Sequence, residues 1–95
     1  MKTNLNLYEL YLGHDNSTKT RFKERLICNI INEYFTSYTL VKSQGYWKGQ
    51  KEDSYLIKLV TNDTRQINKL KGALQLRLNQ ESILKTSYNL HTAEY

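Results

Sequence analysis

The groups best suited to acid–base chemistry stand at the end of the first stretch with strand character. His14 and Asp15 follow that stretch directly, and a working site would also need Tyr11 and Glu81 to approach them. A histidine titrates near neutral pH and a carboxylate can orient it, so this set is a candidate acid–base site. No spacing fixes its geometry, and a histidine in a polar loop is more often solvated. A small acid–base enzyme is therefore kept as an alternative, and no catalytic residue is assigned.

Other kinds of reactive site lack the residues that they need. The single cysteine, Cys28, stands one helical turn from Arg25, yet no motif places a base beside it. Two histidines and one cysteine in three separate regions do not have the spacing of metal ligands. The four glycines are dispersed and form no phosphate-binding loop. The sequence predicts neither a metal nor a cofactor.

A second group of residues could hold a ligand without catalysis. Residues 43–55 contain two glycines and the only tryptophan, between two predicted strands. A glycine at 45 lets the backbone bend, and Trp47 offers a flat surface with one N–H donor. The turn after the second predicted helix would add an amide and a carboxylate. The predicted ligand or partner site comprises Tyr11, Gly45, Tyr46, Trp47, Lys48, Gln80 and Glu81. A purely structural role, with Trp47 packed over the hairpin and Gln80 and Glu81 securing the turn, is the alternative.

The spacing of apolar residues predicts the elements that position these groups. Alternation and β-branched composition indicate strands, and recurrence every three or four residues indicates helices. Between the two middle strands, polar residues 49–53 are expected to form the tip of a hairpin, with a bulge or bend at Gly45. The predicted order is strand 4–13, helix 18–35, strand 38–44, strand 54–61, a helix from Asp63 to about Asn79, and extended residues 80–86, with 90–95 as a continuation or a separate strand.

Both predicted helices carry one apolar stripe. Cys28 and Leu76 fall on the opposite faces and are expected to point outward. Asp63 can cap the second helix, and Gln66 stands where the partner of a capping box belongs. The predicted stripes are Phe22, Leu26, Ile27, Ile30, Ile31 and Tyr34 in the first helix, and Ile67, Leu70, Leu74 and Leu78 in the second.

The order strand, helix, strand, strand, helix, strand predicts a ferredoxin-like α+β sandwich, with residues 1–95 as a single domain. Right-handed crossovers place both helices on one face of an antiparallel sheet and leave the other face open. We expect Leu7, Glu9, Tyr11, Leu40, Lys42, Leu56, Lys58 and Val60 on that open face. A mixed apolar and charged face favours self-association, so the chain is predicted to be a homo-oligomer. The expected interface comprises Leu7, Tyr11, Leu40, Leu56 and Lys58.

The charge balance bears on possible partners. Fourteen basic and nine acidic residues give a formal net charge of +5, which suits solubility or attraction to an anionic partner. Arg21, Arg25 and Lys51 are candidate anion contacts, and non-specific nucleic-acid binding is the first alternative function. The third strand lacks the glycine–aromatic signature of RNA-recognition modules. No run reaches the ~18 apolar residues of a membrane span. No signal peptide is visible and one cysteine forms no internal disulfide, so a cytoplasmic location and no membrane contact are expected.

Three short motifs give the chain a resemblance to known domains. They are Tyr11-Leu12-Gly13, Gln44-Gly45-Tyr46-Trp47 and Asn79-Gln80-Glu81-Ser82-Ile83-Leu84. In these the chain resembles a group of small uncharacterised bacterial and phage domains of ferredoxin-like architecture. The resemblance implies the fold and no mechanism. Together with the small size and the positive charge, it suggests a non-enzymatic binding module, of phage or mobile-element origin. Such a module would inhibit a host or defence component by blocking its surface or by sequestering an anionic nucleotide.

Overall fold

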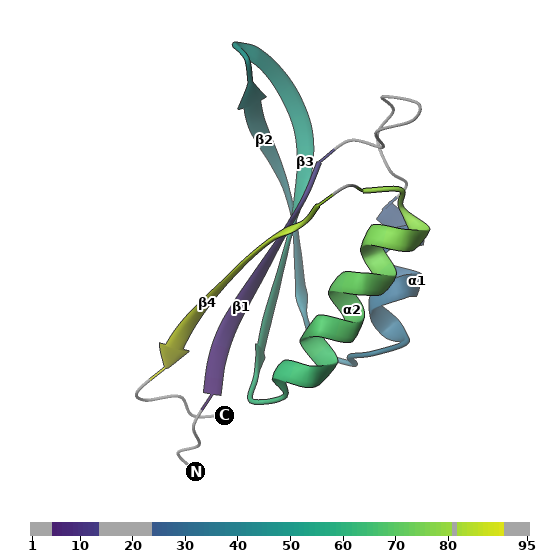
Figure 1. The fold of residues 1–95 in the computed structure, drawn as a ribbon, viewed down its shortest axis with the longest axis vertical. Coiled ribbons are helices and arrows are strands. Elements are labelled where there is room, and N and C mark those ends of the chain that lie inside the picture. Colours follow the sequence, from purple (N-terminus) through teal and green to yellow (C-terminus); the bar gives the residue numbers. More distant parts are fainter. Residues whose placement is uncertain (1–4, 14–23, 81, 91–95) are drawn as a thin grey trace.

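The computed structural model describes residues 5–13, 24–80 and 82–90, without the side chains of Trp47 and Glu52. The two helices lie on the same side of one sheet (Figure 1). This is the ferredoxin-like α+β sandwich that the sequence predicts. In chain order the elements are β1 (Leu5–Leu12), α1 (Glu24–Asn32), β2 (Thr39–Trp47), β3 (Gln50–Thr61), α2 (Thr64–Arg77) and β4 (Leu84–Leu90).

The four strands form an antiparallel sheet in the order β2-β3-β1-β4. β1 lies between β3 and β4, where Leu10 stands opposite Ile57 on one side and Lys85 on the other. Apolar residues stand on both faces of β1, as expected for a strand in this central position. The last described strand, β4, begins at Leu84 rather than at residue 80, and the predicted continuation or separate strand lies in residues 91–95, outside the described part of the chain.

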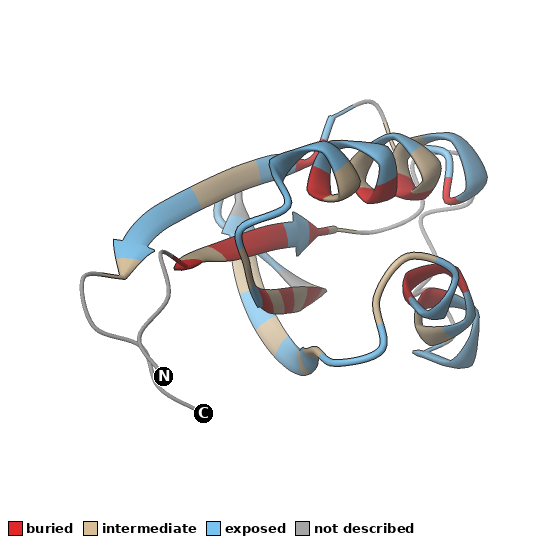
Figure 2. Cartoon of the chain, turned by 90° about the horizontal axis from the view of Figure 1, so that it is seen from below, coloured by how far each residue is buried: buried red, intermediate tan, exposed pale blue. Residues whose placement is uncertain are grey.

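The core fills the space between the sheet and the helices. Side chains with 0% exposure include Leu10 and Ile57 from the sheet and Ile30 and Leu70 from the helices. Figure 2 shows these buried positions along the central strand and on the helix stripes that face it. Burying a side chain of this size stabilises the fold by about 1.5–3 kcal/mol. The core therefore accounts for the fixed arrangement of the helices on one face.

The stripe predicted for the first helix is wrong at one described position. Ile27, Ile30 and Ile31 are buried, but Leu26 is 42% exposed. At about 100° per residue Leu26 lies roughly a quarter-turn from the centre of those three isoleucines, so the sheet does not cover it. Phe22 lies outside the described residues.

The start of α2 is capped as predicted, with one difference. The backbone N–H of Gln66 donates to Oδ1 of Asp63 at 3.0 Å, which satisfies one of the free amides at the helix start. The Gln66 side chain does not complete a capping box, because its Nε2 donates to the carbonyl of Tyr34 at 3.4 Å. The N–H of Asp63 donates instead to Oγ1 of Thr61 at 3.1 Å. The Gln66 side chain thus ties the start of α2 to the segment that follows α1.

The hairpin between β2 and β3 is longer and tighter than predicted. Pairing continues without a bulge through Gly45 opposite Glu52 to Trp47 opposite Gln50. The turn consists of Lys48 and Gly49, with φ angles of 50° and 78°. Two consecutive positive φ values characterise the two-residue turn whose twist matches that of paired strands. The expected bulge at Gly45 and the expected tip at 49–53 are therefore wrong.

This register also moves one predicted interface residue to the other face. Leu40 pairs with Ile57 and packs against the core on the helix side. Lys42 pairs with Tyr55, which is also a core residue, so Lys42 lies on the helix side as well. The prediction that Leu40 and Lys42 face the open side is wrong, and Val41, opposite Leu56, takes that position.

Candidate ligand-binding site

The outer half of the β2–β3 hairpin extends as an arm beyond the two-layer body (Figure 1). We call residues 43–54 the hairpin arm. Its residues are mostly polar, and cross-strand pairing continues to the turn at Lys48 and Gly49. Ser43 and Ser54 join the two strands at its base through a 2.8 Å hydrogen bond between their hydroxyls. Backbone pairing and this bond hold the arm in one shape.

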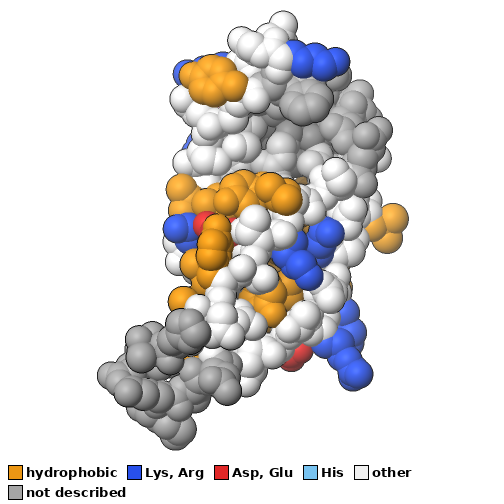
Figure 3. All heavy atoms as spheres, turned by 60° about the vertical axis from the view of Figure 1, so that its left-hand side comes forward, with side chains coloured by type: hydrophobic (Ala, Val, Ile, Leu, Met, Phe, Trp, Pro, Cys, Tyr) orange, Lys and Arg blue, Asp and Glu red, His pale blue; other side chains and the backbone are white. Residues whose placement is uncertain are grey.

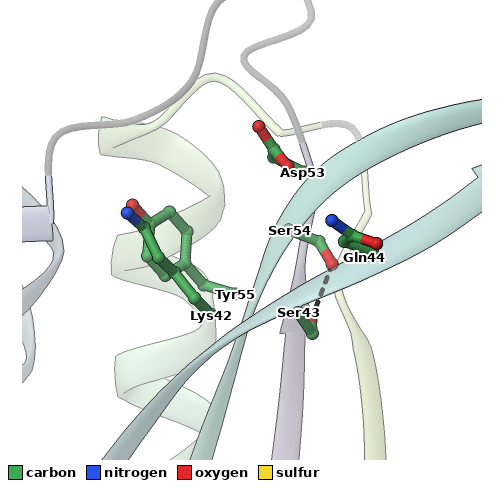
Figure 4. A pocket seen from close by; sticks show the side chains of 6 residues that line it. All are labelled: Lys42, Ser43, Gln44, Asp53, Ser54 and Tyr55. Atoms are coloured by element: carbon green, nitrogen blue, oxygen red, sulfur yellow. Dashed lines mark hydrogen bonds between the residues drawn. The ribbon is translucent and has the colours of Figure 1, made fainter.

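A cavity of about 350 Å³ lies where the hairpin arm leaves the body. Figure 4 shows Lys42 and Tyr55 on the side of the hairpin that faces the helices, and Gln44 and Asp53 further along the arm. The volume of the cavity falls near the lower end of the ~300–1,000 Å³ typical of small-molecule sites. The lining residues are Lys42, Ser43, Gln44, Asp53, Ser54 and Tyr55.

The lining groups offer several kinds of contact within one small space. Lys42 is exposed and supplies an ammonium for an anionic group, whereas the carboxylate of Asp53 accepts hydrogen bonds. Tyr55 is only 3% exposed, so its ring forms part of the cavity wall next to the core. A ligand with a carboxylate at one end and hydroxyl donors elsewhere would match this set.

The predicted site residues are only partly brought together. An added Cβ at Gly13 would lie 4.0 Å from Oε1 of Gln80, so the end of β1 and the turn after α2 are neighbours. Leu12 pairs with Tyr55, which places the same end of β1 at the base of the hairpin arm. The side chain of Trp47, with Glu81, His14 and Asp15, lies outside the described part of the chain.

The remaining predicted contacts are spread over different surfaces. Tyr46 is 71% exposed on the hairpin arm opposite Lys51, with Lys48 at the turn. Tyr11 is 39% exposed on the open sheet face, away from the cavity. Arg25 is exposed on α1, and Arg21 lies outside the described residues. In the described residues the candidate anion contacts therefore form no single basic patch.

None of the six cavity residues belongs to the predicted ligand or partner site, and Gln44 occurs only in one of the three motifs. Lys42 had been placed on the open face, and Asp53 had been assigned to the hairpin tip. Ser43, Ser54 and Tyr55 had been treated as parts of strands. The signal was present in the alternation that makes Tyr55 a core residue, because its cross-strand neighbours follow once the turn is placed at Lys48 and Gly49.

A second polar cluster joins α1 to the start of β2. The hydroxyl of Tyr38 donates to Oδ1 of Asn32 at 3.0 Å. Burial, followed by a hydrogen bond and an electrostatic interaction with Cys28, raises the pKa of Tyr38 to about 12. Cys28 is half-buried, so the prediction that it points outward is wrong. The hydrogen bond with Tyr38 gives the Cys28 side chain a structural role between α1 and the start of β2.

Two classes of site find no support in the residues that the structure describes. Within 5–13, 24–80 and 82–90 no three His, Cys, Asp or Glu residues are grouped as metal ligands would be. Over the same part of the chain, no helix has the length and apolar character needed to cross a bilayer.

The architecture and the cavity define a small ferredoxin-like domain with a protruding hairpin. No protein-family model matches the chain, and no curated protein matches it. Among solved structures, the chain is similar to a phage SAM lyase in complex with S-methyl-5'-thioadenosine, with 18% identity, coverage of 97% of this chain and 92% of the other, and a TM-score of 0.67.

Two further structures of similar size share the fold. A DUF3240 family protein from Shewanella baltica has 10% identity, coverage of 95% and 94%, and a TM-score of 0.65. The divalent ion tolerance protein CutA1 from Ehrlichia chaffeensis has 16% identity, coverage of 99% and 87%, and a TM-score of 0.54. At these identities the similarity establishes the fold.

Proposed function

We propose that this chain is a binding module that captures an S-adenosyl-type nucleoside in the cavity at the base of the hairpin arm. The observation that carries the proposal is the cavity itself, which sets the Lys42 ammonium and the Asp53 carboxylate around a space of about 350 Å³. S-adenosylmethionine has a carboxylate that an ammonium can bind and ribose hydroxyls that can donate to a carboxylate.

The fold adds support to this choice of ligand. A phage protein of the same fold and nearly the same length is a SAM lyase that was solved with S-methyl-5'-thioadenosine. A small phage or mobile-element protein that removes such a nucleoside would deprive a host or defence component of it. We favour this capture of a nucleoside over both the sequestration of an anionic nucleotide and the blocking of a host surface.

Calorimetric titration with three ligands tests the proposal. S-adenosylmethionine and S-methyl-5'-thioadenosine should both bind, and guanosine should bind much more weakly. Lys42→Met should lower the affinity for S-adenosylmethionine by at least about tenfold, because a charge-assisted hydrogen bond contributes about 1.5–3 kcal/mol. The same variant should leave S-methyl-5'-thioadenosine unaffected, since that nucleoside has no carboxylate.

Matched variants make this titration specific. Lys69 is exposed on α2, so Lys69→Met removes the same charge away from the cavity and should change neither affinity. Asp53→Asn should lower the affinity for both nucleosides, because it removes the carboxylate that accepts hydrogen bonds from the ribose hydroxyls. Absence of binding by both nucleosides at millimolar concentration would refute the proposal, as would equal effects of the two lysine substitutions.

Cleavage of the nucleoside is the second candidate, favoured by the lyase activity named for the phage structure. In that reaction the carboxylate of S-adenosylmethionine attacks its own γ-carbon and closes a lactone, while the bond from that carbon to sulfur breaks and the electron pair goes to sulfur. The second product is S-methyl-5'-thioadenosine, which chromatography detects. Capture alone predicts one bound equivalent and no more product than a protein-free control, because S-adenosylmethionine slowly forms the same product on its own. A rate of product formation that exceeds the control and rises in proportion to protein concentration would instead identify an enzyme.

A further inference from the structure

The sheet face opposite the helices combines exposed apolar side chains with a central pair of charges. We call it the open face. The helices pack on the other side, so this side is uncovered within the described residues. Figure 3 brings this side forward and shows hydrophobic side chains gathered over its middle, beside an acidic and a basic group. Cross-strand register assigns to it Leu7, Glu9, Tyr11, Val41, Leu56, Lys58, Val60, Leu84, Thr86 and Tyr88.

Most of the large apolar side chains that the described surface exposes belong to this face. Leu84 is 62% exposed and Tyr88 is 50% exposed, both on the edge strand β4. Tyr11, Val41 and Val60, at 39%, 37% and 41%, extend the same surface across the sheet to β2 and β3. A contiguous apolar patch with few charges commonly marks a surface that another molecule covers.

The charges at the centre of the open face are balanced. Glu9 is only 9% exposed although it lies on this uncovered side. Its Oε2 lies 4.0 Å from Nζ of Lys58, and its Oε1 accepts a long 3.5 Å hydrogen bond from Thr86. The Lys58 side chain remains 43% exposed and has donors left for a further carboxylate. These two residues are the only charges that the register assigns to the four-stranded part of the face.

We infer that the open face packs against the open face of another copy of this chain. One acid and one base side by side make the surface complementary to itself, since the base of one copy can meet the acid of the next across a symmetry axis. The two charges assigned to the face cancel, so the net charge of +5 comes from groups elsewhere on the chain and no excess of like charge is brought into the contact. An anionic lipid surface would instead require a basic face. This inference is independent of the proposed nucleoside site.

Sedimentation velocity over a range of protein concentrations tests the inference. The unmodified chain should form a discrete species of two or more copies. Leu84→Glu places a charge on the open face at a position that is already 62% exposed, so the fold should survive. It should raise the dissociation constant by at least about tenfold. Leu76→Glu is the matched control, because Leu76 is 84% exposed on α2, and it should leave the assembly unchanged.

A charge exchange separates self-association from binding of a foreign partner. Lys58→Glu gives each copy two acids, so this variant alone should be monomeric. Mixing it with Glu9→Lys should restore a mixed species, whose circular dichroism should match that of the unmodified chain. If Glu9→Lys fails to fold, the comparison of Leu84→Glu with Leu76→Glu in sedimentation velocity still tests whether the open face carries the self-association. A monomeric unmodified chain at all concentrations, or equal effects of those two substitutions, would overturn the inference.

Discussion

Replacement of Lys58 by methionine should destabilise the fold by removing the ammonium beside the buried carboxylate of Glu9. The two charged atoms lie 4.0 Å apart, with exposed side-chain fractions of 43% for Lys58 and 11% for Glu9. Two unit charges at this distance attract by about 1 kcal/mol in water and about 4 kcal/mol at an effective dielectric constant near 20. Because one partner is half-exposed, we expect a loss of about 1–2 kcal/mol, below the 3–5 kcal/mol of a fully buried pair.

A double-mutant cycle with Glu9→Gln isolates the interaction from other effects of each substitution. Urea unfolding of the four proteins, at one low concentration that keeps them dissociated, should give a coupling free energy of about 1 kcal/mol. Lys69→Met, on the exposed side of α2, should change stability by less than about 0.5 kcal/mol. A coupling below about 0.3 kcal/mol would refute the claim that Lys58 stabilises Glu9 in the folded chain.

Three other predictions concern single local features. Asp63→Ala should cost about 1 kcal/mol in urea unfolding by removing the cap of Gln66 N–H, whereas Asp63→Asn should retain most of that stability. Gly49→Ala should cost about 1–2 kcal/mol because φ is 78°, and Gly45→Ala, with no atom within 4 Å of the new Cβ, should cost far less. The pKa of Tyr38 is raised from 10.0 to about 12, so the folded chain favours the neutral phenol. The contribution of this group to the free energy of unfolding should therefore be fully present below pH 10 and should be lost as the pH rises to 12. Phenolate absorbance of the folded chain should accordingly lose a titration step near pH 12 in Tyr38→Phe, and an unchanged curve would contradict that value.

Much of the fold followed from patterns that have a single physical reading. The alternation of β1 and the stripe of Ile67, Leu70 and Leu74 each predict one buried face, and the structure buries those side chains. The cap at Asp63 was equally visible, because a short polar acceptor stood just before an apolar helical stripe. The outward position of Leu76 follows from the same stripe and is confirmed by its 84% exposure.

The hairpin could not be predicted at the same level. Both Gly45 and Gly49 permit a turn, and the polar residues after Gly49 resemble a loop although they pair as a strand. Outside the core no buried face imposes an apolar alternation, so the register depends on the turn alone. Taking Lys42 as outward-facing placed Leu40, which has the same parity, on the wrong face, and expecting the tip at 49–53 instead of at Lys48 and Gly49 concealed the cavity. Leu26 shows a related limit, since helical spacing does not reveal how wide a stripe the sheet will cover.

Amide chemical-shift mapping with S-methyl-5'-thioadenosine is the most direct test of the proposed nucleoside site. Binding in the cavity predicts the largest shifts at Ser43, Gln44, Asp53 and Ser54, with little change along the outer side of α2. Shifts confined to the open face, or none at millimolar nucleoside, would contradict the assignment of a nucleoside site to the hairpin arm.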